Sequence, residues 1–166
     1  MPITLAFDEL LAYTDEEREK WNVWFRAQPP EIWRLPVQPG GRFPNVWSLL
    51  DHIVVVERRH LQRLGNLYPL PESTGVAEGR WDELWRTAQG LRGQLREYAA
   101  GLDESQANVL GKVQIGDDWA EVTPRKLLFH VLLHELRHWA QLALVFRKAG
   151  LNPPGDHDLV FSRVVS

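Results

Sequence analysis

Apolar side chains recur every three or four residues in four separate stretches of the chain, a spacing that places them on one face of an α-helix. Proline-containing segments separate the first three stretches, and Gly150, Pro153 and Pro154 follow the last, where a helix cannot continue. Asn45 and Thr123 stand where a capping side chain is expected at a helix start. The pattern predicts helices over residues 4–27, 46–66, 81–100 and 124–149.

Residues 109–122 carry a weaker pattern. Two short apolar stretches, 109–115 and 119–122, flank Gly116 and two aspartates, which fits a short hairpin with a glycine–aspartate turn. A polar linker fits the same residues, and the pattern does not decide between them. With 166 residues and no internal repeat, the chain is predicted to form one domain, residues 1–166. The predicted fold class is all-α. We expect a four-helix bundle, and the pattern leaves open a short hairpin before the last helix.

The last predicted helix is apolar almost all round. Leu127 and Val131 lie on the side of its histidines, while Leu132 and Leu136 cover much of the other side. Such a helix is buried on more than one face, either within its own bundle or against a second subunit. A homodimer is therefore one expectation for this chain.

Composition narrows the classes of function. The formal charge of −3 provides no basic field for a phosphate backbone, so no nucleic-acid partner is expected. No apolar run approaches the ~20 residues of a membrane span, and the N-terminus has no signal-peptide pattern, so we expect a cytoplasmic protein without a membrane partner. The chain has no cysteine, so a metal ion would need nitrogen and oxygen ligands.

Three of the six histidines follow one another at intervals of four on the last predicted helix. His134 and His138 lie on its inward side, and side chains four apart on a helix can share one metal ion. His130 is about 12 Å of helix rise from His138, too far for the same ion, so we assign it to the pocket or to a supporting hydrogen bond. A third ligand must come from the second helix, and periodicity alone leaves both His52 and His60 open.

Two motifs resemble those of the DinB family (DinB/YfiT-like proteins): Trp47–Ile53, read as WSLLDHI, and His130–His138, read as HVLLHELRH. The resemblance covers nearly the whole chain in helix order. It implies a four-helix bundle that holds a metal ion through one histidine early in the second helix and two on the last. Nitrogen ligands suit zinc, nickel, copper or iron(II), and we expect a divalent ion, zinc or nickel. On this basis His52, His134 and His138 are the expected ligands, and His60, His130 and Glu135 are expected to line the pocket or to support a ligand. Family members commonly carry arginine directly after the final histidine, where this chain has Trp139.

The resemblance also implies a class of activity. Relatives include metal-dependent transferases and isomerases that use a low-molecular-weight thiol, so we expect a small-molecule substrate and a stress-response or detoxification enzyme, a transferase or a hydrolase. Catalytic residues are not identified by the sequence. A non-enzymatic bundle with a structural metal site is the first alternative. The second is a zinc peptidase, in which His134-Glu135-x-x-His138 would supply Glu135 as general base. Otherwise Glu135 supports a ligand histidine or pairs with a charge on Arg137 or a neighbouring helix.

Overall fold

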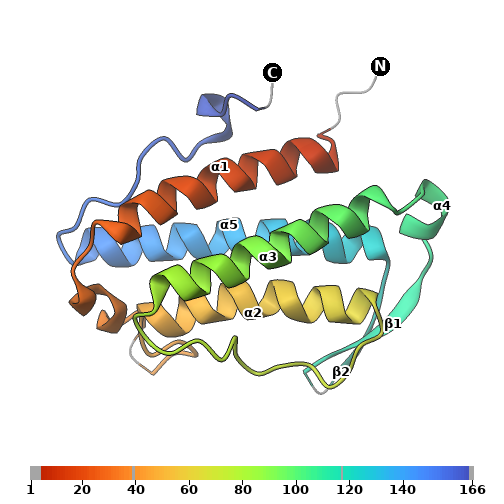
Figure 1. The fold of residues 1–166 in the computed structure, drawn as a ribbon, viewed down its shortest axis with the longest axis horizontal. Coiled ribbons are helices and arrows are strands. Elements are labelled where there is room, and N and C mark those ends of the chain that lie inside the picture. The colour runs from red at the N-terminus through yellow and green to blue at the C-terminus, as the bar shows by residue number, and fades with distance from the viewer. Residues whose placement is uncertain (1–4, 39, 117, 165–166) are drawn as a thin grey trace.

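The computed structural model describes residues 5–38, 40–116 and 118–164. Four long helices form a bundle (Figure 1), as the periodicity predicts, and the all-α class is confirmed. The first predicted helix start, residue 4, lies outside the described residues, and the other predicted ends differ from the observed ones by at most two residues. The long helices are α1 (Phe7–Arg26), α2 (Val46–Leu64), α3 (Trp81–Ala100) and α5 (Pro124–Lys148).

The bundle is not a simple up-and-down arrangement. Helices α2 and α3 run in the same direction, and α1 and α5 run together in the opposite direction (Figure 1). The segment 65–80 therefore travels back along the bundle before α3 begins. Helix α5 packs against both α1 and α2, and α3 also contacts both of them. This arrangement brings α2 and α5 side by side and antiparallel.

The segment 109–122 forms the predicted hairpin rather than a linker. Strand β1 (Gly111–Ile115) pairs antiparallel with β2 (Asp118–Val122), and Val113 and Val122 pack against Leu127 at the start of α5. Three short helical turns were not predicted from the sequence. They are α4 (Glu104–Ala107) and two 3-10 helices, Pro30–Arg34 and Leu159–Phe161.

Both predicted caps are present. The Asn45 side chain accepts a hydrogen bond of 2.9 Å from the backbone N–H of Ser48, and Thr123 accepts one of 3.1 Å from Lys126. Each bond satisfies an N–H that has no partner within the first turn of its helix, a contribution of about 0.5–2 kcal/mol. The start of α2, six residues before His52, is thereby defined by its own sequence.

The core contains a large aromatic cluster built by α1, the first 3-10 helix and the ends of α3 and α5, with Trp21, Phe25 and Phe146 almost fully buried. Leu132 and Leu142 of α5 are also fully buried, whereas Leu133 and Leu144 remain more than half exposed. One side of α5 is therefore open in the single chain, and the homodimer stays a prediction. Within the described residues, no helix combines the length and the hydropathy needed to cross a membrane.

Candidate metal centre

The Nε2 atoms of three histidines converge between α2 and α5. His52 Nε2 lies 3.0 Å from His134 Nε2, which lies 3.1 Å from His138 Nε2. All three can present a ligand atom within 4.8 Å of one another, and all three side chains are buried. Two donors each ~2.1 Å from one ion, at angles of ~90–109°, would be separated by ~3.0–3.4 Å. The spacing of these nitrogens suits a shared divalent ion.

Hydrogen bonding within the protein cannot satisfy this arrangement. His138 Nδ1 lies 3.0 Å from Oε1 of Gln141, and because an amide oxygen only accepts, Nδ1 carries the proton and Nε2 presents a lone pair. His134 Nε2 faces two other Nε2 atoms but can hold at most one proton. A cation accepts lone pairs from all three rings at once. The donor set therefore fits a metal ion better than it fits a histidine network.

The electrostatic surroundings keep the rings neutral. Burial, reinforced by Arg42 and His138, lowers the pKa of His52 to about 4. Burial and the two neighbouring histidines lower the pKa of His134 to about 2, and burial also lowers the pKa of His138. Arg137 acts in the same direction on all three histidines. Neutral imidazoles near pH 7 are the form that binds metal.

Phe43 was not identified from the sequence, because it lies in an irregular segment before α2 that carries no periodic signal. Its ring centroid is 4.7 Å from that of His52 and 5.7 Å from that of His138. The guanidinium carbon of Arg42 lies 5.4 Å from the centroid of the same ring. The loop thus places an aromatic wall and a positive charge beside the three Nε2 atoms.

His60 and His130 lie beside the centre without joining it. Their ring centroids are 5.0 Å apart, and the ring of His130 is 5.6 Å from that of His134. Arg63 Nη1 approaches His60 Nδ1 at 3.4 Å, and burial followed by Arg63 lowers the pKa of His60 to about 3. His130 is exposed. Among the described residues, the group that can hold an ion contains His52 and not His60, in agreement with the ligand set that the resemblance implied.

Glu135 lies elsewhere than in the predicted pocket. Its Oε1 accepts from Arg18 Nε at 2.5 Å and from Trp139 Nε1 at 3.0 Å, and its Oε2 accepts from Arg92 Nη2 at 2.5 Å. Although burial alone would raise the pKa of Glu135, the two arginines hold it below its ordinary value. Arg18 also forms an ion pair with the buried Glu57 of α2. The carboxylate therefore joins α5 to α1 and α3, one of the alternatives that the sequence left open.

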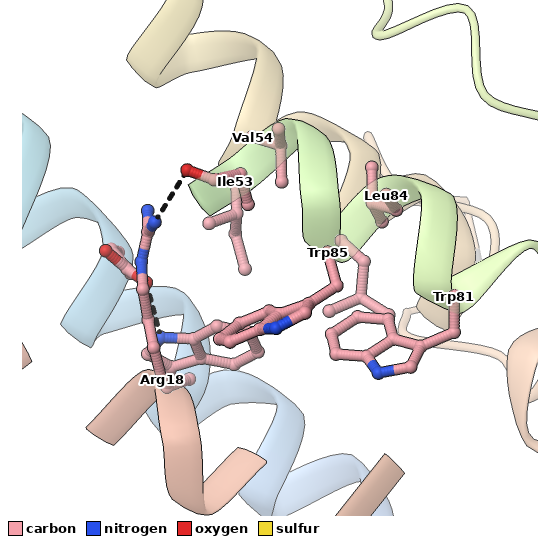
Figure 2. Close-up of a pocket in the computed structure, with 10 residues that line it drawn as sticks. Arg18, Ile53, Val54, Trp81, Leu84 and Trp85 are labelled. Atoms are coloured by element: carbon pink, nitrogen blue, oxygen red, sulfur yellow. Dashed lines mark hydrogen bonds and ion pairs between the residues drawn. The ribbon is translucent and has the colours of Figure 1, made fainter. Parts of the chain in front are cut away.

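This buried charge network borders a small cavity of about 10 Å³, shown in Figure 2. Arg18 lies at one side of the view, while Trp81, Leu84 and Trp85 of α3 lie across from it. The space is close to the minimum for one water molecule, and apart from Arg18 and Glu135 its lining is apolar or aromatic. It is too small for a substrate and supports only a packing role.

Trp139 occupies the position at which the family resemblance leads us to expect an arginine. Its ring stacks on Trp21 at a centroid distance of 5.1 Å, and its indole N–H is held by Glu135. The side chain is buried on the α1 side of α5, away from the three converging histidines.

Comparison with known proteins identifies a family for this chain. A search of curated proteins finds no match to this chain. The family model described as DinB family matches residues 1–164. The match covers essentially the whole length and includes all three converging histidines. This chain belongs to the DinB family.

Proposed function

We propose that the protein is a divalent-metal enzyme in which His52, His134 and His138 bind zinc or nickel and a low-molecular-weight thiol is the co-substrate. The observation that carries the proposal is the convergence of three neutral Nε2 atoms, at 3.0 and 3.1 Å. Nitrogen ligation suits both ions. Three protein ligands leave a coordination position open, as in catalytic rather than structural sites.

Charge favours an anion as the further ligand. A divalent ion held by three neutral imidazoles keeps its full +2 charge, and the arginines that act most strongly on His52, Arg42, Arg59 and Arg137, are positive as well. When bound, the metal would lower the pKa of a thiol and stabilise its thiolate as a nucleophile. Because the chain contains no cysteine, the thiol has to come from a second molecule. A transferase that joins such a thiol to an electrophile follows from this chemistry.

The remaining side chains have supporting roles in the proposal. Gln141 fixes the tautomer of His138, so that its Nε2 keeps a lone pair for the ion. Phe43 packs on two of the ligand rings and shields them from water on that side. His130 is exposed and adjacent to His134, where it can exchange a proton with bound substrate.

Two other functions receive less support. A peptidase would need Glu135 free to activate water, yet three donors from Arg18, Arg92 and Trp139 occupy its two oxygens. A purely structural metal site would be expected to close its coordination with a fourth protein ligand. Within residues 5–38, 40–116 and 118–164, the group able to hold an ion consists of three histidines.

Metal binding is tested first, by elemental analysis of the purified protein beside His52→Ala and His60→Ala. Both histidines are buried on α2, so His60→Ala is a matched control for the loss of an imidazole. We expect about one equivalent of metal in the wild type and in His60→Ala, and a large loss in His52→Ala. Equal loading of all three proteins would refute the ligand assignment.

The thiol is tested on protein loaded with Co²⁺, whose visible spectrum reports its ligands. Addition of a small thiol such as 2-mercaptoethanol is expected to produce a thiolate-to-cobalt absorption band, and the corresponding alcohol, ethylene glycol, is the control. Turnover is then sought with thiols and alkyl or epoxide electrophiles. Absence of the band and of metal-dependent turnover would leave the structural-site alternative.

A further inference from the structure

A groove of about 610 Å³ runs between α2 and α3. On α2 its wall includes Arg58, Leu61 and Gln62, and Leu61 lies about half a turn round the helix from His52. The metal centre lies between α2 and α5, so the groove is separate from it. A volume of this size is within the range for small-molecule sites.

The two ends of the groove differ in chemistry. Helices α2 and α3 run in the same direction (Figure 1), so the first wall residue of each helix, Arg58 and Arg86, lies at the same end. Leu67, just beyond α2, and Tyr98 of α3 lie at the other end, about 18 Å of helix rise from Arg86. Leu67 is 60% exposed, and Tyr98 is half-buried. The groove is therefore basic at one end and apolar and aromatic at the other.

The basic end is not neutralised by the protein. None of the ten described residues that line the groove is acidic. The acidic residues one turn before Arg86 on α3, Asp82 and Glu83, form their ion pairs with other arginines. Arg86 Nε donates to the carbonyl oxygen of Asp82 at 3.2 Å, and Arg58 Nη1 donates to that of Thr74 at 3.4 Å. Each guanidinium has five N–H donors, so both can also bind an oxyanion in the groove.

Gly90 lies midway along the groove, within α3. A glycine inside a helix is less favourable than an alanine, because the unfolded chain loses more conformational freedom there. A Cβ atom added at Gly90 would meet no heavy atom within 4 Å, so packing within the described chain does not require a glycine. The missing side chain keeps the groove open along the backbone of α3, where a ligand can lie.

We propose that this groove binds an amphiphilic acid, a molecule with one carboxylate or phosphate head and a linear apolar chain. The head pairs with Arg58 and Arg86, whose N–H groups match the geometry of an oxyanion. The chain passes Gly90 and packs on Leu67 and on the ring of Tyr98. The order of charges and apolar groups along the groove selects such a molecule. A cationic head would meet two arginines and no carboxylate of the wall.

The proposal is tested by isothermal titration calorimetry on the full chain, with probes kept below their micellar concentrations. Octanoate and octyl phosphate are the acids, 1-octanol is the uncharged control and octyltrimethylammonium is the cationic control. We expect saturable one-to-one binding of at least one acid, at least tenfold weaker binding of the alcohol, and still weaker binding of the cation. The tighter acid identifies the head group. Binding of the cation as tight as that of the acids, or no saturable binding of either acid, would overturn the proposal.

A carboxylate can also bind a metal ion, so the titration is repeated on His52→Ala and on protein treated with a chelator. Acid binding in the groove should be unchanged in both. Loss of acid binding together with the metal would place the acid at the metal centre and overturn the proposal.

Variants of α3 locate the site. Gly90→Leu fills the middle of the groove and should weaken binding of octanoate and of octanol at least tenfold, whereas Gly93→Leu, outside the groove wall, should leave both unchanged. Both glycines have open space around an added Cβ. Arg86→Gln serves if Gly90→Leu does not fold, and it should weaken binding of the acid several-fold more than that of the alcohol. Arg147→Gln makes the same change in net charge on the exposed side of α5 and is its control. Unchanged acid binding in folded Gly90→Leu or in Arg86→Gln would exclude this groove as the site.

Discussion

Glu135→Gln separates a structural role from a catalytic one. Glu135 belongs to a His-Glu-x-x-His motif, in which a glutamate that acts as general base can be neutralised with loss of activity and little loss of stability. In this chain the same carboxylate holds Arg18 and Arg92, each at 2.5 Å and each at most 3% exposed. The structure therefore predicts that the substitution acts mainly on folding.

The magnitude follows from burial. Glutamine keeps the shape of the side chain but removes the negative charge, and its amide N–H₂ then faces a guanidinium. Two buried arginines are left with Glu57 as their remaining buried carboxylate, together with the partly exposed Asp15. Breaking a buried pair by neutralising one partner costs about 3–5 kcal/mol. For a chain of this length that corresponds to a fall in Tm of roughly 6–20 °C.

The assay is urea denaturation at pH 7 followed by circular dichroism, with Glu78→Gln as the control. Glu78 pairs with Arg34 at 2.9 Å, but both side chains are well exposed, so its neutralisation should cost less than about 1 kcal/mol. Metal content of folded Glu135→Gln should remain that of the wild type, because the glutamate does not contact the three histidines. A loss of stability below 1 kcal/mol for Glu135→Gln would refute the account of the network.

Three further predictions concern separate features. Burial lowers the pKa of His60 from its ordinary 6.5 to about 3. Between pH 6.5 and pH 3 the unfolded chain therefore binds a proton at His60 that the folded chain does not. The metal-free protein should lose up to about 1.4 kcal/mol of stability per pH unit as the pH falls through this range. Urea denaturation at pH 7, 6 and 5 should show a shallower dependence in His60→Gln, and identical slopes would contradict this. Gln141→Leu should weaken metal binding about 10–100-fold in a chelator competition, with unchanged affinity counting against its role on His138. Leu132→Ala, at a fully buried position, should cost about 2–5 kcal/mol in urea denaturation, whereas Leu133→Ala on the exposed side should stay within about 0.5 kcal/mol; equal effects would mean that the side facing the core is misassigned.

The long helices were predictable because their signals are local. Capping by Asn45 and Thr123 and the prolines after the first helix act within a few residues, and the structure confirms each boundary to within two residues where it is described. The short turn α4 has four residues and no buried side chain, so it leaves no apolar period to detect. The hairpin was undecided for the same reason, since only Val113 and Val122 of its ten residues are buried.

The candidate site also combines features that lie within one helix, which the sequence predicts, with features that depend on how the helices pack, which it does not. The spacing of His134 and His138 is a property of one helix and was readable from the sequence. The choice of His52 over His60 depends on how α2 lies against α5, which periodicity cannot supply, so it came from the family resemblance and agrees with the observed group. The partners of Glu135 come from α1 and α3, 117 and 43 residues away, and no local pattern could have identified them.

His134 and Glu135, adjacent residues of α5, contact different helices of the bundle. His134 turns toward α2 and its histidine, while Glu135, about 100° further round the helix, engages α1 and α3. A metal ion bound by both α2 and α5 would resist their sliding, and the ion pairs of Glu135 with Arg18 and Arg92 would limit rotation of α5 about its own axis. Since a rotation of α5 would separate the Nε2 atoms of His134 and His52, the network positions the site without contacting it. Folded Glu135→Gln should therefore still bind as much metal as the wild type when metal is in excess, but with an affinity that falls as far as α5 becomes free to turn. An unchanged affinity in a chelator competition, in a variant that has lost about 3–5 kcal/mol of stability, would show that the network does not position the site.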